Sequence, residues 1–192
     1  EATVSHVYYT TLLEHLGCTA TASEEARHVV GDQLAMRRVM SHTDEMRPRE
    51  MLALLGQVGQ GHGPLGHVRA AAGMMAGFRW GPPVQAAVCE VASRLAGRLG
   101  LPSEVREALG QVFERWDGKG NPRGLRGESI ATPARFAQVG SRAAALHHLG
   151  GAEAAIAGVR ASSGGWLDPT VATVFVARGA EFLAEMDSAD AL

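Results

Sequence analysis

The sequence predicts an all-α protein, and three observations support that prediction. Apolar residues recur at intervals of three and four along most of the 192 residues, which is the period of an amphipathic helix. Glycine and proline stand where these segments end and begin. No segment shows a convincing strand or hairpin pattern, and no internal repeat is present.

Three helices are predicted in the N-terminal part of the chain. The first covers about residues 4–16, where apolar positions form a wide face, so we expect it to be central and largely buried. Gly17 is expected to end it. A second helix covers about residues 23–40, and a third begins at Pro48, because proline fits the first turn of a helix. A glycine-rich loop is predicted at 56–66.

The next helices have clearer boundaries. A helix over residues 67–78 precedes the most regular apolar stripe of the chain, at residues 84–99. Gly100 is expected to end that helix, in line with the frequent glycine after a helix terminus. Pro102 is expected to open the following one, whose stripe runs as far as Phe113.

A break in the helical period separates these helices from the last three. Residues 115–130, RWDGKGNPRGLRGESI, are rich in glycine, proline and cations, so an ordered loop is predicted there. Thr132 and Pro133 are expected to cap and open a helix that runs to about Leu149. Another helix follows at 152–160, and Asp168–Pro169 opens the last one.

Composition narrows the class of protein. With 46% hydrophobic residues, 20% charged residues and a net charge of -2, the chain is expected to fold as one domain rather than remain disordered. No membrane span or signal peptide is evident, and Cys18 and Cys89 form no CxxC motif, so a cytoplasmic protein with no membrane partner is predicted. Because a helical pattern is already under way near Glu1, we expect the chain to be a fragment of a longer protein.

Charge is distributed unevenly along the sequence. Residues 61–142 contain 11 of the 18 cations, and the loop region 115–135 is the densest part. Such a region is either a solvated basic surface or a binding face for an anion or an acidic segment.

Several motifs resemble the HD-GYP family of helical metal-dependent phosphohydrolases. They are FERWDGKGNPRGLRGESI at 113–130, Ala134–Arg135 and Asp168–Pro169, and LLEHLGC at 12–18 is similar to the family segment LLHDIGK. The resemblance implies an HD-domain-like helical bundle over residues 1–192. It also implies the activity of the family's active members, which hydrolyse cyclic di-GMP at a two- or three-iron site.

The residues that match the family's metal ligands differ from it. A multi-iron site needs several imidazole and carboxylate ligands that converge on one point. Here the HD pair is replaced by Glu14 and His15, the following lysine by Cys18, and the tyrosine of GYP by Asn121. The remaining ligand positions are occupied by Val88, Val112, Phe113 and Gly140. We therefore predict no catalytic residue, no metal and no cofactor, and lean against an enzyme.

Three segments are similar to the degenerate first HD-GYP module of actinobacterial LuxR-type regulators: LLEHLGCTA, GDQLA and LGQVFERWDGKG. This resemblance implies a non-catalytic sensory or interaction module of a transcriptional regulator. Its partners would be a small molecule or an adjacent HD-like module, with DNA bound only through a helix-turn-helix outside the fragment. A homodimer is a further option, and a purely structural dimerisation domain is a third hypothesis. The alternative is a phosphohydrolase, or cyclic di-GMP phosphodiesterase, with a displaced metal site built from Glu14, His15, Cys18, His28 and Asp32.

The candidate residues for ligand or partner binding fall into two groups. One is the end of the first helix, and the other is the basic loop; the members are Glu14, His15, Cys18, Arg115, Asp117, Lys119, Arg123 and Arg126. His15 lies on the predicted apolar face, so it is expected to be a buried, hydrogen-bonded core residue unless it binds a ligand. Asp117 precedes a glycine and is expected to be a turn residue that bonds its own backbone. The four cations of the loop are expected to meet phosphates or an acidic partner, or to be solvated.

Overall fold

The computed structural model confirms an all-α architecture for the residues it describes, which are 1–18, 43–44, 47–57, 63, 65–66, 68–69, 72–73 and 81–190. The named elements are α1 (Ala2–Leu13), α4 (Pro48–Gln57), α6 (Gly81–Arg98), α7 (Ser103–Leu109), the short 3-10 helix η1 (Gly127–Ser129), α8 (Thr132–Ser162) and α9 (Pro169–Asp190). Within these residues the sole β feature is an isolated bridge between Ser163 and Leu167. None of the described helices combines the length and apolarity that a membrane crossing requires.

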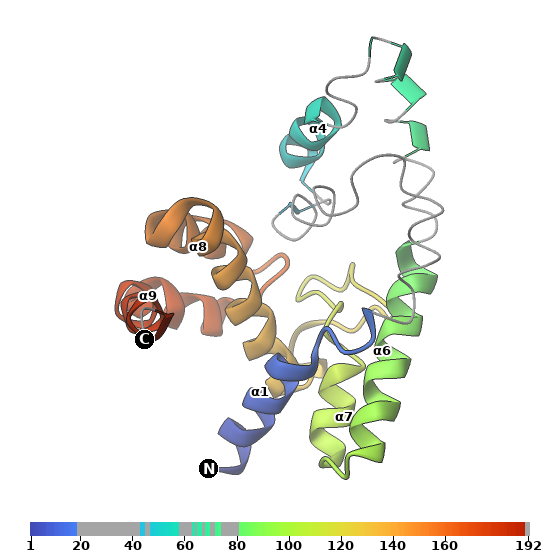
Figure 1. Cartoon of the computed structure of the whole chain (residues 1–192), viewed down its shortest axis with the longest axis vertical. Helices are drawn as coiled ribbons and strands as arrows, with labels where there is room; N and C mark the ends of the chain where they lie inside the picture. The colour runs from blue at the N-terminus through green and yellow to red at the C-terminus, as the bar shows by residue number, and fades with distance from the viewer. Residues whose placement is uncertain are drawn as a thin grey trace.

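The helices other than α4 form two contacting groups. Figure 1 shows α6 and α7 side by side, with α1 in front of α8 beside them, and α9 against the far part of α8. Helix–helix contacts join α8 to α9, α1 to both α7 and α8, and α6 to α7. Because α1 and α7 both contact α8, the long helix α8 links the two groups into one body.

The core is built mainly from small and medium apolar residues. One cluster lies between α8 and α9, a second joins α6 and α7 to Leu13 of α1, and a third fixes the loop after α7. Their fully or nearly fully buried members are Val139, Ala143, Val159, Leu167 and Ala172, then Ala92, Ala96, Val105 and Leu109, and then Ala108, Ile130 and Ala134. The many alanines allow the helices to approach closely, since little side-chain volume separates their axes.

Most predicted boundaries in the C-terminal part are confirmed. Gly100 follows α6 with a φ of 74°, a conformation in which glycine avoids the steric cost of a side chain. The helices predicted at 132–149 and 152–160 are joined in α8 across a kink at Gly150–Gly151. Asp168 caps α9 as predicted, because its Oδ1 accepts the N–H of Thr170 at 2.7 Å.

Three boundaries differ from their predictions. Helix α1 ends at Leu13, with Glu14 at its C-cap position, and does not continue to Gly17. Thr132 does not cap α8, which has Ala131 at its N-cap position; the Thr132 hydroxyl instead accepts a bond from Arg135. Helix α7 ends at Leu109, so Val112 lies in the turn that follows it.

The prediction that the first helix is largely buried is wrong. Thr10 is the one buried residue of α1, whereas Val4, Tyr8 and Leu12 are 72%, 61% and 61% exposed. The helix contacts α7 and α8 on one side, and apolar periodicity cannot show whether the other side is also covered. The helix predicted at 23–40 lies outside the described residues.

Candidate functional site

The first candidate site lies where α1 ends. Glu14 follows α1 directly, and its buried carboxylate accepts a hydrogen bond from the Ser141 hydroxyl of α8. The Nε2 atom of His15 lies 3.4 Å from the Glu14 Oε1 atom. Burial raises the pKa of Glu14, although the bond from Ser141 and the nearby His15 act to lower it. The fold therefore keeps this carboxylate desolvated and ties it to α8.

His15 is not the buried core histidine that the sequence predicts. Its side chain is 79% exposed, because Glu14 rather than His15 turns toward α8. The Cys18 Sγ lies 3.9 Å from the His15 Nδ1, so the predicted residues at this helix end do come together. Ser141 was not predicted, although it directly follows Gly140, the position matched to a family ligand.

The positions matched to the family's metal ligands do not fit a metal centre. Val88 is buried in α6, and its carbonyl oxygen occupies the space that a Cβ on Gly17 would need. Val88, Phe113 and Gly140 have no side-chain atom that can coordinate a cation. Across the described part of the chain, no three His, Cys, Asp or Glu residues are grouped to hold a metal ion. His28 and Asp32 lie outside that part.

The second candidate site is the loop after α7, which three buried polar side chains organise. Both carboxylate oxygens of Glu114 accept backbone N–H groups, from Arg123 at 2.7 Å and from Leu125 at 2.8 Å. The side-chain amide of Gln111 accepts the N–H of Ala131 at 2.6 Å, and that of Gln138 donates to the Glu114 carbonyl at 2.8 Å. These bonds satisfy backbone groups that an irregular segment would otherwise leave unpaired.

Two glycines of the WDGKG sequence have backbone positions that a side chain would disturb. Gly118 has a φ of 80°, in the left-handed region. A Cβ on Gly120 would overlap the backbone of Glu114 and Arg115. The loop therefore needs glycine at these two places for its shape.

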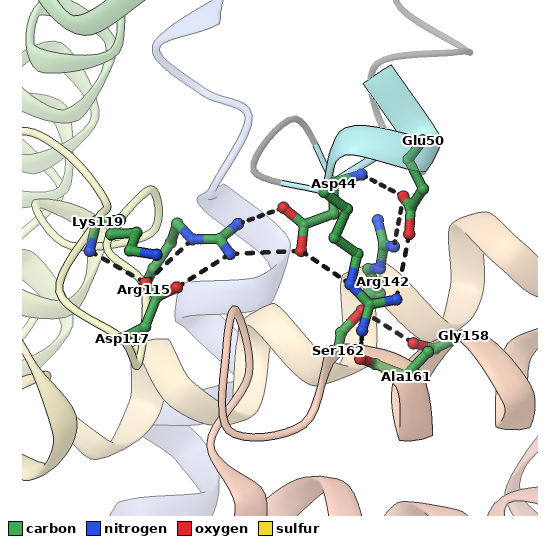
Figure 2. Close-up of polar contacts among 10 residues, drawn as sticks. Asp44, Glu50, Arg115, Asp117, Lys119, Arg142, Gly158, Ala161 and Ser162 are labelled. Carbon is green, nitrogen blue, oxygen red and sulfur yellow. Dashed lines mark hydrogen bonds and ion pairs between the residues drawn. The ribbon is translucent and has the colours of Figure 1, made fainter. Parts of the chain in front are cut away.

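Arg115 differs from the solvated or phosphate-facing cation that its place in the basic loop predicts. Its residue is 7% exposed, and its Nη1 donates to the Asp44 Oδ1 at 2.9 Å (Figure 2). The Nε donates to the Asp117 Oδ1 at 3.2 Å, and the guanidinium carbon lies 5.4 Å from the Trp166 ring centroid. Asp44 precedes Arg115 by 71 residues, and no local signal in the sequence could have identified this partner.

Asp117 is the turn residue that the sequence predicts, with Arg115 as an added partner. Its Oδ1 accepts the backbone N–H of Lys119 at 3.0 Å. Partial burial acts to raise the pKa of Asp117, but the bonds from Arg115 and Lys119 outweigh it and hold the pKa below its ordinary value. The carboxylate thus stays charged and is engaged within the protein.

The remaining predicted cations lie on the surface. Lys119, Arg123 and Arg126 are all exposed, and we call these three residues the basic edge. The loop's cations are therefore divided: Arg115 is part of the interior, and the basic edge faces solvent.

An ionic network extends from Arg115 to the segment that carries α4. Arg142 of α8 is buried, with its guanidinium carbon 4.5 Å from the Trp166 ring centroid and its Nη2 3.9 Å from the Glu50 Oε2. Burial lowers the pKa of Arg142, although Glu50 acts to raise it. Arg47 donates to the Ala161 carbonyl at the end of α8. Charged groups from distant parts of the sequence thus hold this segment against the body.

Comparisons with known proteins support an HD-domain fold. Residues 87–171 match a family described as HD domain. In structure, the chain is similar to a cyclic GMP-AMP-specific phosphodiesterase of V. cholerae, with a TM-score of 0.60 and 20% sequence identity. That similarity covers 92% of this chain and 38% of the phosphodiesterase, so the chain spans well under half the length of that protein. No curated protein matches the chain. The chain is thus all-α, with an HD-domain match from α6 to the start of α9.

Proposed function

We propose that this chain is a non-catalytic HD-domain module that acts as the sensory or interaction part of a transcriptional regulator. The observation that carries the proposal is that four positions matched to the family's ligands have no side-chain atom that can coordinate a metal, namely Val88, Val112, Phe113 and Gly140. A multi-metal hydrolase needs these ligands to orient the attacking water and to neutralise charge on the phosphate. Here Glu14 is hydrogen-bonded to Ser141, and the backbone of Gly17 packs against Val88.

A second candidate function is metal-dependent phosphohydrolysis at a displaced site. The similarity in fold to a cyclic GMP-AMP-specific phosphodiesterase favours it. Glu14, His15 and Cys18 lie together and could supply part of a ligand set. His28 and Asp32 would have to complete that set.

Metal analysis and a hydrolysis assay distinguish the two candidates. The protein is purified without chelator, its iron and manganese content is measured, and it is then incubated with each metal and with cyclic di-GMP or cyclic GMP-AMP. We expect far less than one metal ion per chain and no hydrolysis above the protein-free reaction. Near-stoichiometric metal together with hydrolysis, both lost in Glu14→Gln or His15→Ala, would instead establish the displaced site.

The basic edge is the surface that we assign to binding. Three exposed cations on a loop fixed by Glu114 can attract an anionic small molecule or an acidic face of an adjacent module. In the regulator that the sequence resembles, such binding would alter the position of a DNA-binding domain outside this chain. A cytoplasmic location is part of the same proposal.

Calorimetric titration with cyclic di-GMP tests the basic edge. We expect binding that is weak and becomes weaker with added salt, because exposed charges are screened within about 8–10 Å at physiological ionic strength. The double variant Arg123→Gln/Arg126→Gln should reduce it, whereas Arg98→Gln/Arg160→Gln, which alters two exposed cations elsewhere, should not. Tight, salt-insensitive binding would contradict this account.

A further inference from the structure

Helix α1 presents an exposed row of large apolar side chains. Val4, Tyr8 and Leu12 are spaced by four residues and lie on one face, which we call the α1 stripe. The opposite face is covered, since Thr10 is fully buried and Leu13 packs in the cluster of α6 and α7. The helix ATVSHVYYTTLL contains no Asp, Glu, Lys or Arg, so neither face has the charged side chains that usually meet water.

This combination indicates a surface that another helix covers. A contiguous apolar row on a rigid element marks an interaction site. Single exposed apolar residues are common on soluble proteins and need no explanation. Three exposed apolar residues in a row on one helix do need an explanation. A partner that covers them would also supply the burial that the sequence predicts for this helix and that the single chain does not provide.

The stripe is symmetric about Tyr8. Val4 and Leu12 lie four residues to either side of it, at about 6 Å along the helix axis. Glu1 and His15 flank the two ends of the helix, seven residues to either side of Tyr8, and both are exposed. Two such helices packed antiparallel around a twofold axis at Tyr8 would place Val4 against Leu12 and Glu1 against His15.

We propose that a second copy of this chain covers the α1 stripe in an antiparallel, twofold-symmetric pair. Twofold contacts use the same patch on both partners, so a patch that is complementary to itself is what they require. Here apolar side chains meet apolar side chains, and a carboxylate meets an imidazole at each end. The antiparallel arrangement also opposes the two helix dipoles favourably. The inference rests on α1 alone and does not depend on the proposed function.

The size of the surface sets the strength of the pairing. A stable interface buries about 800 Å² on each partner, and three large side chains with their neighbours supply less than that. The pairing is therefore weak and depends on protein concentration.

Sedimentation velocity over a series of concentrations tests the pairing. The 192-residue protein is expected to shift from monomer toward dimer as its concentration rises. Tyr8→Glu should abolish the shift, because two carboxylates would meet on the axis, and circular dichroism should show unchanged helicity. Val174→Glu is the matched control, since Val174 is an exposed apolar residue of α9, and it should dimerise like the parent. A parent protein that stays monomeric, or a dimer that persists in Tyr8→Glu, would overturn the proposal.

Disulfide trapping tests the antiparallel register. In a Cys18→Ser background, Tyr8→Cys should form a linked dimer on mild oxidation, because this position meets its own copy on the axis. Val4→Cys and Leu12→Cys should link rapidly when mixed and slowly when alone. Faster linking of Val4→Cys with itself than with Leu12→Cys would rule out this register.

Discussion

Glu114 and Glu14 are both buried carboxylates, but the chain gives them different partners. Glu114 is fully buried, and each of its oxygens accepts a backbone N–H from the loop. Glu14 accepts one hydroxyl, from Ser141, and lies beside the exposed imidazole of His15. Burial raises the pKa of Glu14, so the cost of desolvation is only partly offset there.

The difference separates a loop whose shape is fixed by buried side chains from a helix end that has no such support. The loop around Glu114 is specified by several buried hydrogen bonds and by glycines at constrained positions. The region around Glu14 has one buried acid beside His15 and Cys18, whereas Val88 and Gly140, at other positions matched to family ligands, have no side-chain atom that can coordinate a metal. A loop fixed in this way can present a binding surface without a working metal centre nearby, which is the arrangement that the proposed function requires.

Removal of the Glu114 side chain should have the largest effect on stability. Glu114→Ala removes the acceptor of two partly buried N–H groups, those of Arg123 and Leu125, and hydrogen bonds to a charged group contribute about 1.5–3 kcal/mol each. We expect the free energy of unfolding to fall by about 4 kcal/mol in a denaturant titration. Glu128→Ala, which alters an exposed acid of the same loop, should change it by less than about 0.5 kcal/mol. Similar losses in the two variants would contradict the role given to Glu114.

The second prediction compares the buried and the exposed cations of the loop, and its expected loss of stability is smaller than that for Glu114. Arg115→Ala removes the 2.9 Å ion pair of the buried Asp44, which keeps its contact with Arg47 at 3.7 Å, and breaking a buried ion pair costs about 3–5 kcal/mol. Arg123→Ala removes an exposed cation and should cost less than about 0.5 kcal/mol. Because Asp117 keeps the Lys119 N–H, we expect Arg115→Ala to lie near the lower limit, about 3 kcal/mol. Equal stability of the two variants would show that Arg115 is not part of the interior.

Replacement of Glu14 should have the smallest effect on stability, and that effect depends on pH. The pKa of Glu14 is raised above its ordinary value of 4.5, so between these two values the folded protein binds more protons than the unfolded chain. Stability from this group is therefore present at low pH and falls as the pH rises through the raised pKa. Glu14→Gln keeps an acceptor for Ser141 and removes this dependence.

Denaturant titrations at several pH values check the sign. Relative to the parent, Glu14→Gln should gain stability as the pH rises from 4.5 to neutrality. Ser141→Ala serves as the control, because it removes the bond and keeps the carboxylate. A Glu14→Gln curve parallel to that of the parent would refute the raised pKa.

The local rules of helix formation account for what could be predicted. The apolar stripe of α6, Gly100 after it and the Asp168 cap of α9 were predicted because each depends on residues close in sequence. The turn at Asp117 belongs to the same class, since its carboxylate bonds the N–H of Lys119 two residues later. The all-α class follows from the helical period and needs no knowledge of packing.

The sequence by itself therefore determined the fold class, most helix boundaries in the C-terminal part and the turn at Asp117, because short-range sterics and hydrogen bonds decide these. Only the tertiary structure decided which side chains are covered. It exposed Val4, Tyr8 and His15, buried Arg115, and brought Asp44 and Ser141 to residues far from them in the sequence. Burial and ion pairing depend on which elements meet in space, and a single helix pattern carries no information about its neighbours.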